Sequence, residues 1–301
     1  MTGPLHSSTA PSAAGPSPSP ARRSGGRRPR TPIVATVLQT RPLSPTMTRI
    51  VLGGPGLAGF TPNEYSDAYV KLVFPRPGVE YPHPLDLSVV REKLDPADWP
   101  RQRTYTVRAW DPAARELTID FVVHGEEGLA GPWARAARPG DEILLVGPGG
   151  GYAPDPAAGW YLLVGDESAL PAIAATLERL PAAALGQVLV EVPGGEQEQP
   201  LPGPPGMRIR WVHTGDRPLG VALVEAVTEV AFGTGPVQAF VHGEAGTVKE
   251  LRRVLRLERG LSPAQLSISG YWRLGADDEA WRAFKAEWNR EIEQAELLAQ
   301  S

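Results

Sequence analysis

Cysteine is absent from this chain of 301 residues. Its absence excludes disulfides, thiolate nucleophiles, cysteine-bound zinc and iron–sulfur clusters held by the chain itself. Histidine is scarce, with 5 residues, and the His-Glu-x-x-His pattern of zinc proteases is missing. Long apolar runs are missing as well, so we expect no insertion into a membrane. A redox protein with this sequence must therefore use an organic cofactor or an imported metal, and we expect no resident metal site.

The first thirty residues contain no acid and few large apolar side chains, and they are rich in serine, proline, alanine, glycine and arginine. Such a segment cannot bury a core, so we expect residues 1–30 to be a disordered and dispensable tail. The tail also lacks the apolar stretch of a secretory signal, which favours a cytoplasmic location. The formal net charge of −4 includes this basic tail, so the rest of the chain is more acidic and offers no nucleic-acid-binding face.

Short alternating segments fill residues 31–154. They are rich in valine, isoleucine, leucine, threonine and aromatic residues, and turns separate them: TPIVATVLQT, DAYVKLVFP, RTYTVRAW, ELTIDFVVHG and DEILLVGPGG. Alternation with a period of two, broken by Pro/Gly turns, indicates antiparallel strands. Such spacing is typical of an antiparallel barrel or sandwich, and of the two we expect a β-barrel here.

The pattern changes in residues 155–301, where apolar strand-like runs alternate with segments of helical spacing. The strand-like runs are WYLLVG, QVLVEV, MRIRWVHT, VQAFVHG and QLSIS. Strands that alternate with helices predict a parallel sheet and an α/β nucleotide-binding domain. The last long segment predicts an amphipathic helix packed on the body, because large apolar residues recur at three- and four-residue steps, at Trp281, Phe284, Trp288 and Ile292.

One strand carries side chains that suit a long anionic ligand. In Arg103-Thr104-Tyr105-Thr106, alternate residues of an extended strand can reach a ligand that lies along it. Arg103 can bind a phosphate through two hydrogen bonds, Tyr105 can stack on a ring, and Thr106 can bond a ring heteroatom. The same tetrapeptide is also ordinary strand sequence, so alone it does not identify a ligand.

A stretch of small residues comes before Trp133 in the segment 124–150. These small residues would let backbone N–H groups approach an anion ahead of a short helix. His124, at the end of a predicted strand, suits either acid–base chemistry or a structural hydrogen bond. The segment therefore has both a binding and a structural interpretation.

Two strand-to-helix junctions lie where parallel sheets bind nucleotides. The first is Gly165-Asp166-Glu167-Ser168-Ala169, in which Ser168 suits the N-cap of the next helix. The second is Gly243-Glu244-Ala245, which a cationic helix follows. Neither contains Gly-x-Gly-x-x-Gly, so the ordinary dinucleotide fingerprint is absent and each junction could be a plain βα turn.

Taken together in this order, the motifs resemble those of the siderophore-interacting proteins, which are flavin-dependent ferric-siderophore reductases of the ferredoxin-reductase-like superfamily. The similar stretches are RTYTVR, the run from DFVVHG to GPGG, VGDESALPAI, and GEA…VKELRRVL…RG…SGYWRLG. The resemblance spans about residues 32–290. It implies an FAD-binding β-barrel followed by an NAD(P)-binding α/β domain, with FAD and either NADPH or NADH as cofactors.

The resemblance also implies contacts residue by residue. For FAD they are Arg103 on the pyrophosphate, with Thr104, Tyr105, Thr106, Asp120, Val122, His124, Gly131, Trp133 and Ala134. For the nicotinamide nucleotide they are Gly165, Asp166, Glu167, Ser168, Ala169, Gly243, Glu244 and Ala245. At the edge of the flavin they are Tyr271 and Trp272. Facing the ferric siderophore they are Lys71, Lys249 and Arg252.

The chain departs from the family pattern at two places. It reads GLAGPW where the family has a serine and an arginine before the tryptophan, so pyrophosphate binding must depend on Arg103 and backbone amides. The strand that usually ends in arginine here ends in His213-Thr214. This change weakens NADPH as the electron donor, unless Arg210 or Arg217 replaces the missing arginine.

The implied reaction passes a hydride from NAD(P)H to FAD, and then single electrons from the flavin to the Fe(III) of a siderophore. Reduction releases the iron, because hard oxygen chelators hold Fe(III) far more tightly than Fe(II). No catalytic acid or base is needed, and we expect a monomer. Two alternatives stay open: an NAD(P)H:flavin or ferredoxin-type reductase with another acceptor, and a non-enzymatic siderophore-binding flavoprotein.

Overall fold

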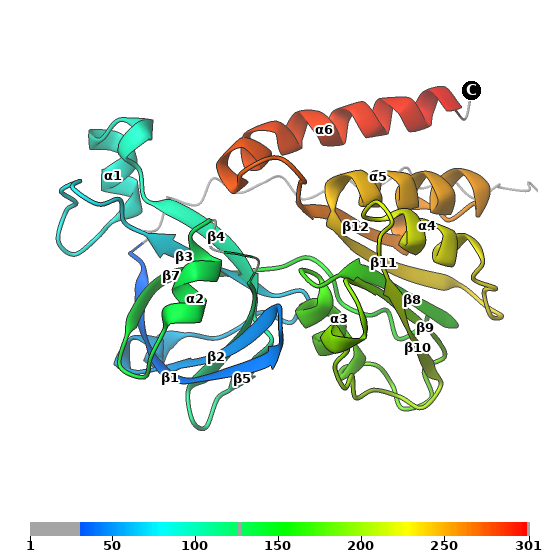
Figure 1. The fold of residues 1–301 in the computed structure, drawn as a ribbon, viewed down its shortest axis with the longest axis horizontal. Coiled ribbons are helices and arrows are strands. Elements are labelled where there is room, and N and C mark those ends of the chain that lie inside the picture. The colour runs from blue at the N-terminus through cyan, green and yellow to red at the C-terminus, as the bar shows by residue number, and fades with distance from the viewer. Residues whose placement is uncertain (1–30, 124, 126–127, 300–301) are drawn as a thin grey trace, which may run out of the picture.

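The computed structural model describes residues 31–123, 125 and 128–299, and Figure 1 shows their fold. Two sheets make up the body, one from each half of the chain, and a long C-terminal helix lies beside the second sheet. The tail 1–30 and His124 lie outside the described residues, so the expectations for them stay predictions. In the described part of the chain, no helix has both the length and the apolar character needed to cross a membrane.

The first sheet has seven antiparallel strands in the order β4-β3-β7-β1-β2-β6-β5. The strands are β1 (Ile33–Ser44), β2 (Met47–Gly53), β3 (Tyr69–Phe74), β4 (Arg101–Thr106), β5 (Ala109–Asp111), β6 (Glu116–Val122) and β7 (Glu142–Gly149). β4 and β5 stand at opposite ends of this order, yet Val107 and Arg108 alone separate them in the chain. The sheet must therefore curl until its two edges meet, which confirms the predicted antiparallel barrel.

Alternation along the strands builds the core of the barrel. On β6, Leu117, Ile119 and Phe121 are fully buried, because successive strand residues point to opposite faces of the sheet. Helix α1 (Leu87–Lys93) belongs to the connection between β3 and β4. Helix α2 (Ala130–Ala136) packs into the same core as β6.

The second sheet has five parallel strands in the order β10-β9-β8-β11-β12. They are β8 (Trp160–Asp166), β9 (Gly186–Val192), β10 (Met207–His213), β11 (Val237–Glu244) and β12 (Leu266–Trp272). One face is covered by α3 (Leu170–Leu177), and the other by α4 (Val221–Thr228) and α5 (Ala245–Arg253). Every residue of β8 is buried, as expected for a central strand covered on both faces, and the predicted α/β domain is confirmed.

Several short turns connect these elements. They are the 3-10 turns at Pro55–Gly59, Pro96–Asp98, Gly195–Gln197 and Pro263–Gln265 and a π turn at Val254–Glu258. The predicted boundary between the two parts of the chain, after residue 154, falls in the segment between β7 and β8. The limits of the two domains stay predictions.

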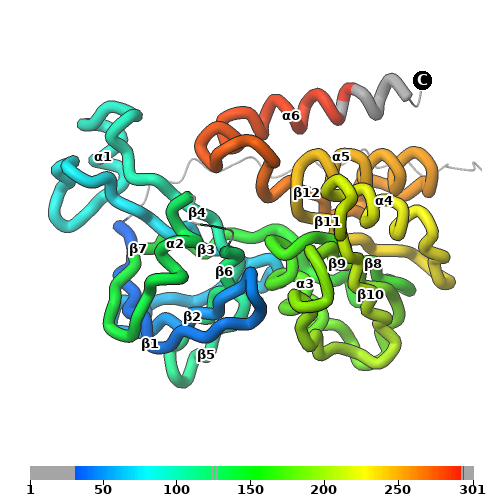
Figure 2. Tube along the Cα trace, viewed as in Figure 1, coloured from blue at the N-terminus to red at the C-terminus, as the bar shows by residue number. Residues whose placement is uncertain are grey.

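Helix α6 (Asp278–Ala299) packs Trp281, Trp288 and Ile292 against α5 and the neighbouring strand β12. Phe284 was expected on the same face but is 37% exposed. At about 100° per residue it lies roughly 60° away from the line of the other three, at the edge of the apolar stripe. In Figure 2 the helix starts between the two sheets and runs alongside α5. Its first turn therefore lies close to the barrel.

Candidate functional site

A cleft of about 860 Å³ separates the barrel from the parallel sheet. Residues of β3, β4 and β6, together with α6, line one side, and the carboxyl ends of the parallel strands line the other. Of the residues predicted to contact ligands, those in the lining are Lys71, Arg103, Thr104, Tyr105, Thr106, Asp120, Val122, Asp166, Glu167, Ser168, Tyr271 and Trp272. The structure thus brings half of the predicted set into one cleft.

The other described residues of that set lie outside the lining. They are Gly131, Trp133, Ala134, Gly165, Ala169, Gly243, Glu244, Ala245, Lys249 and Arg252. Trp133 belongs to α2 and packs against Phe121 in the barrel core, with ring centroids 5.6 Å apart. Lys249 is exposed on α5. Contacts from these residues to a ligand stay predictions.

β4 is the barrel strand that contributes most to the cleft, with Arg103, Thr104, Tyr105 and Thr106 in the lining. Arg103 and Tyr105 are two residues apart on the strand, so they project to the same side. Tyr105 packs on Phe121 of β6 with ring centroids 4.4 Å apart, which holds its ring in place. Burial raises the pKa of Tyr105, so the phenol is protonated at neutral pH. This wall can offer a cation and a neutral aromatic ring to one extended ligand.

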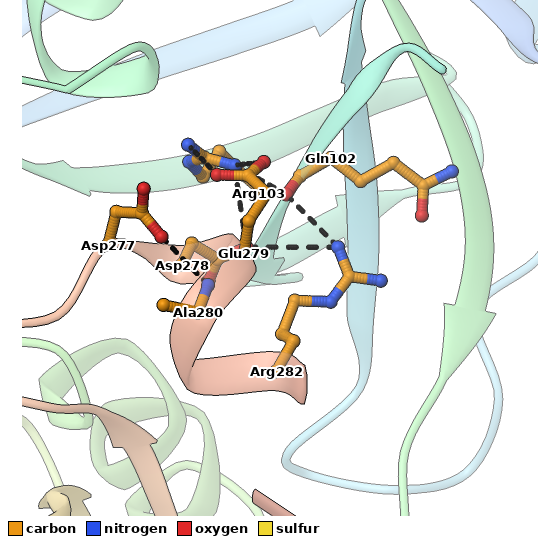
Figure 3. Close-up of polar contacts among 7 residues, drawn as sticks. All are labelled: Gln102, Arg103, Asp277, Asp278, Glu279, Ala280 and Arg282. Carbon is orange, nitrogen blue, oxygen red and sulfur yellow. Dashed lines mark hydrogen bonds and ion pairs between the residues drawn. The ribbon is translucent and has the colours of Figure 1, made fainter. Parts of the chain in front are cut away.

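Arg103 has carboxylate partners on the first turn of α6. Its guanidinium donates to both carboxylate oxygens of Glu279, at 2.6 and 2.9 Å, and lies 3.5 Å from Asp278 (Figure 3). Beside it, Arg282 donates to the backbone carbonyl of Gln102 at 3.3 Å. A fork of two parallel bonds to a planar anion is also the geometry that suits a phosphate. Helix α6 thus places carboxylates where the resemblance implies a pyrophosphate.

Asp120 lines the cleft, but its hydrogen bonds hold the barrel together. It accepts two bonds from Arg49 on β2, at 2.6 and 2.7 Å, and the Arg108 guanidinium lies 3.9 Å away. The Asp120 side chain is 4% exposed, and a carboxylate so deeply buried needs such partners. We interpret Asp120 as a residue that joins β2 to β6 and shapes the cleft wall.

Asp166, at the end of β8, joins three strand ends. Its carboxylate accepts bonds from the backbone N–H of Ser168 at 2.9 Å, the backbone N–H of Glu244 at 2.8 Å and the indole N–H of Trp272 at 2.7 Å. Ser168 also donates its hydroxyl to Asp166. The expected N-cap role of Ser168 is therefore wrong: helix α3 has Ala169 as its N-cap, and the hydroxyl turns back to the carboxylate instead.

The glycines of both junctions are required by close packing. A Cβ on Gly165 would lie 2.5 Å from the Cβ of Ala169, and one on Gly243 would lie 2.8 Å from the Asp166 carboxylate. Gly243 also has a φ of +148°, a conformation that favours glycine. The Glu244 side chain then caps the start of α5. Gly165, Gly243 and Glu244 therefore shape the base of the cleft, although they do not line it themselves.

A buried histidine lies beside Tyr271 in the cleft. His242 stacks on Phe240 with ring centroids 3.9 Å apart, and Tyr271 meets it edge-on at 4.8 Å. Its Nε2 lies 3.0 Å from Ser267 Oγ. Burial lowers the pKa of His242 to about 3, so the ring is neutral at pH 7. Sequence reasoning missed His242, because a histidine within an apolar strand carries no signal of its own.

Two cations of the cleft, Arg282 and Lys285 on α6, were also missed. Lys285 donates to Ser269 Oγ at 2.9 Å, and burial lowers the pKa of its ammonium group. The packing of α6 on β12 turns this side of the helix toward the cleft, and no local pattern encodes that direction. With Lys71 and Arg103, these residues bring four cations to the side formed by the barrel and α6, where the acids are Asp67, Asp120 and Asp278.

The carboxyl ends of β8 and β9 are acidic, because Asp166, Glu167 and Glu191 line the cleft there. Glu191 accepts the backbone N–H of Gly220 through both oxygens, at 2.9 and 3.1 Å, and burial raises its pKa. Glu167 accepts a hydrogen bond from the Thr46 hydroxyl of the barrel, which connects the two halves. Within the described residues, no cluster of three histidine or acidic side chains could hold a metal.

An antiparallel barrel and a parallel sheet with a ligand-sized cleft between them make up a two-part fold that a crystal structure of a siderophore-interacting protein shares. Two family profiles match the chain: the siderophore-interacting FAD-binding domain over residues 36–152, and the siderophore-interacting protein over residues 158–275. The chain therefore belongs to the siderophore-interacting protein family. Its N-terminal part is a siderophore-interacting FAD-binding domain.

Known relatives cover most of the chain. An uncharacterised protein of Mycobacterium tuberculosis is 47% identical over 274 residues, which are 86% of this chain and 95% of that protein. The ferric vibriobactin reductase ViuB of Vibrio cholerae is 34% identical over 79% of this chain and 88% of its own. The NADPH-dependent ferric-chelate reductase of Escherichia coli is 31% identical over 79% and 91%. The crystal structure of SipS, a siderophore-interacting protein from Aeromonas hydrophila, matches with a TM-score of 0.73 at 32% identity, over 87% of this chain and 99% of SipS.

Proposed function

We propose that this chain passes electrons from a reduced nicotinamide nucleotide through FAD to a ferric siderophore. The observation that carries the proposal is the cleft in which one face of β4 meets the carboxyl ends of a parallel sheet. Open α/β sheets bind nucleotides at the carboxyl ends of their strands. A nicotinamide bound there would face a flavin on the barrel, as hydride transfer between them requires.

The side chains on the barrel side of the cleft fit FAD. Arg103 supplies a guanidinium fork that suits a pyrophosphate, and Tyr105 supplies a fixed ring on the same face of the strand. Bound FAD would accept a hydride and give up its electrons singly. Arg103 would bind and orient the pyrophosphate, while Tyr105 and Thr106 would hold the flavin ring and its edge. Trp272, fixed by its bond to Asp166, would shield the ring from water.

The choice of nicotinamide follows from the charges at the other side of the cleft. The arginines that could replace the missing family arginine already have partners, since Arg217 pairs with Glu225 at 2.5 Å and Arg210 with Glu229 at 3.4 Å. Glu191 at the end of β9 is 3% exposed, and both of its oxygens accept the backbone N–H of Gly220. Recognition of a 2′-phosphate calls for an arginine near this position, and no arginine of the described residues lines the cleft at the ends of β9 and β10. We therefore infer that NADH is the preferred donor.

The acceptor side is argued from the cations of the cleft. Lys71, Arg282 and Lys285 would attract an anionic ferric siderophore into an otherwise acidic protein. The name of ViuB, which states the reduction of ferric vibriobactin, supports this acceptor class. Reduction to Fe(II) would weaken the hold of hard oxygen ligands and release the iron. Lys249 lies outside the cleft lining, so we assign it no part in this step.

Anaerobic stopped-flow absorbance tests the proposal in two steps. The holoenzyme should lose its oxidised flavin absorbance with NADH faster than with NADPH. Ferric catecholate, hydroxamate or carboxylate chelates should then restore it. If neither nucleotide bleaches the flavin, the reductase proposal is wrong. If the flavin bleaches and no ferric chelate restores it, the acceptor is wrong. The monomeric state and the cytoplasmic location stay predictions.

A further inference from the structure

Two neighbouring strands of the parallel sheet, β8 and β11, mark the point where the strand order reverses. From β8 the chain continues outward to β9 and β10, and it then returns to add β11 and β12 on the other side of β8. Helix α3 covers one face of the sheet, while α4 and α5 cover the other. Open α/β sheets bind ligands outside the carboxyl ends of the strands at such a switch point. A nucleotide would therefore meet the residues at the ends of β8 and β11.

His242 lies at this switch point. It is paired in register with Gly165 of β8, and it is the residue that β11 contributes to the lining of the cleft. The next residues of the chain, Gly243 and Glu244, have packing and capping tasks and do not line the cleft. His242 is therefore the side chain of β11 that is placed to meet a ligand.

The His242 ring is fixed, but one of its nitrogens has no partner. Phe240 stacks on the ring, Tyr271 meets it edge-on, and Ser267 pairs with Nε2. The other ring nitrogen, Nδ1, is buried and makes no hydrogen bond within the described residues. Buried polar atoms of native proteins are nearly always hydrogen-bonded. A fixed ring with an unpaired nitrogen, in the lining of a cleft, therefore indicates a contact for a polar ligand atom.

Tyr271 connects His242 to the flavin end of the barrel. Its phenol interacts electrostatically with Asp67 and Tyr69 of the barrel, while its ring contacts His242. Tyr69 is paired in register with Thr106 of β4, the residue that the resemblance places at the edge of the flavin. A nicotinamide that lies against the flavin there has the barrel on one side and His242 on the other.

The chemistry of His242 suits an uncharged amide. Burial lowers its pKa to about 3, so the ring is neutral at pH 7 and exerts no net attraction on an anionic chelate. An unpaired imidazole nitrogen donates or accepts a hydrogen bond, depending on the tautomer. The carboxamide of a nicotinamide carries an N–H₂ donor and a C=O acceptor, so it can pair with either tautomer.

We propose that His242 binds the carboxamide of the nicotinamide through Nδ1 and thereby orients the ring toward the flavin. Because Nδ1 is buried beside Tyr271, the Tyr271 ring must turn aside as the nicotinamide enters. The proposal rests on the proposed function, because it takes a nicotinamide nucleotide as the electron donor. It goes further by assigning the orientation of the nicotinamide to a residue that no sequence motif singled out.

Isothermal titration calorimetry of the oxidised holoenzyme with NAD⁺ and with ADP-ribose tests the assignment, because ADP-ribose is NAD⁺ without its nicotinamide. His242→Phe keeps the stacking on Phe240 but has no ring nitrogen. It should weaken NAD⁺ binding about fivefold, the scale of one neutral hydrogen bond, and change ADP-ribose binding less than about twofold. His242→Gln restores hydrogen-bonding atoms and should recover part of the loss. His83→Phe, exposed between β3 and β4 and outside the cleft lining, is the matched control and should change neither affinity.

Anaerobic stopped-flow absorbance adds a measure of orientation. In His242→Phe the limiting rate of flavin reduction at saturating NADH should fall about tenfold, because small misplacements of reacting groups cost that much or more. The rate at which a ferric chelate reoxidises the flavin should stay the same. Unchanged NAD⁺ binding, equal losses for NAD⁺ and ADP-ribose, or a loss confined to the chelate step would overturn the role of His242. A wild-type flavin that neither NADH nor NADPH reduces would overturn the proposed function itself.

Discussion

The two sides of the cleft use their polar residues in different ways. On the barrel side, Arg103 projects from a regular strand and meets a carboxylate of α6 that a ligand anion can replace. On the sheet side, Asp166 and Glu244 turn back into the fold, where they join strand ends and cap a helix. Arg103 on its strand face is therefore available to a ligand, whereas Asp166 and Glu244 at packed strand ends already have structural tasks.

This difference follows from the geometry of the two sheets. A barrel strand exposes every second side chain to one face without disturbing its backbone bonds. The carboxyl ends of parallel strands leave backbone N–H groups without partners, and a buried side chain must satisfy them. Asp166 serves this need for the N–H groups of Ser168 and Glu244.

Asp166→Ala should have the largest effect on folding. The change leaves the buried backbone N–H of Glu244 and the indole N–H of Trp272 without an acceptor, so the free energy of unfolding should fall by about 3 kcal/mol. Urea unfolding followed by circular dichroism measures the loss. Asp166→Asn keeps one acceptor oxygen and should recover part of it. Unchanged stability together with lost NADH binding would make Asp166 a ligand contact and remove the contrast between the two sides.

Arg103→Ala should act on the cofactor and not on the fold. Loss of a charged two-bond partner should weaken FAD binding about 30-fold, equivalent to about 2 kcal/mol, and give a colourless purified protein. Its ion pair with Glu279 is partly exposed, so the free energy of unfolding should change by less than about 1 kcal/mol. Arg103→Lys keeps the charge without the fork and should be intermediate. A variant that retains tightly bound flavin would place the pyrophosphate elsewhere.

The fold could be predicted from the sequence because both halves carry strong periodic signals. Leu117, Ile119 and Phe121 alternate inward on β6, and β8 is apolar throughout because helices cover both of its faces. Phe284 was misplaced because three- and four-residue steps do not distinguish the centre of an apolar stripe from its edge.

The part of the site on β4 could be predicted most directly from the sequence. Arg103 and Tyr105 are neighbours on a single face, so their meeting needs no tertiary information. Arg282 and Lys285 reach the cleft because α6 docks on β12 in one particular rotation. Local sequence does not encode that rotation, so Arg282 and Lys285 were absent from the predicted cations.

The stability of the sheet side should depend on pH through His242. Burial lowers the pKa of His242 to about 3, below the ordinary value near 6.5, so the unfolded chain binds a proton that the folded chain does not. Stability should therefore be complete above pH 6.5 and fall as the pH decreases toward 3. At pH 5.5 the free energy of unfolding should be lower by about 1.4 kcal/mol because of His242. His242→Phe keeps the stacking and should remove this part of the pH dependence in urea titrations. If the free energy of unfolding changes equally with pH in the two proteins, His242 titrates normally.

Substitutions of Lys71 and Lys249 should have the smallest effects. They test from which side of the protein the ferric siderophore approaches. Lys71 lines the cleft on β3, whereas Lys249 is exposed on α5 outside the lining. Lys71→Ala should raise the KM for an anionic ferric chelate about threefold at low ionic strength, and added salt should reduce the difference because it screens the charge. Lys249→Ala is the matched control and should leave the KM unchanged. The rate of flavin reduction by NADH should be the same in both variants, because that step does not involve the chelate. A larger effect of Lys249→Ala would mean that the substrate docks on α5, outside the cleft that the barrel and the sheet share.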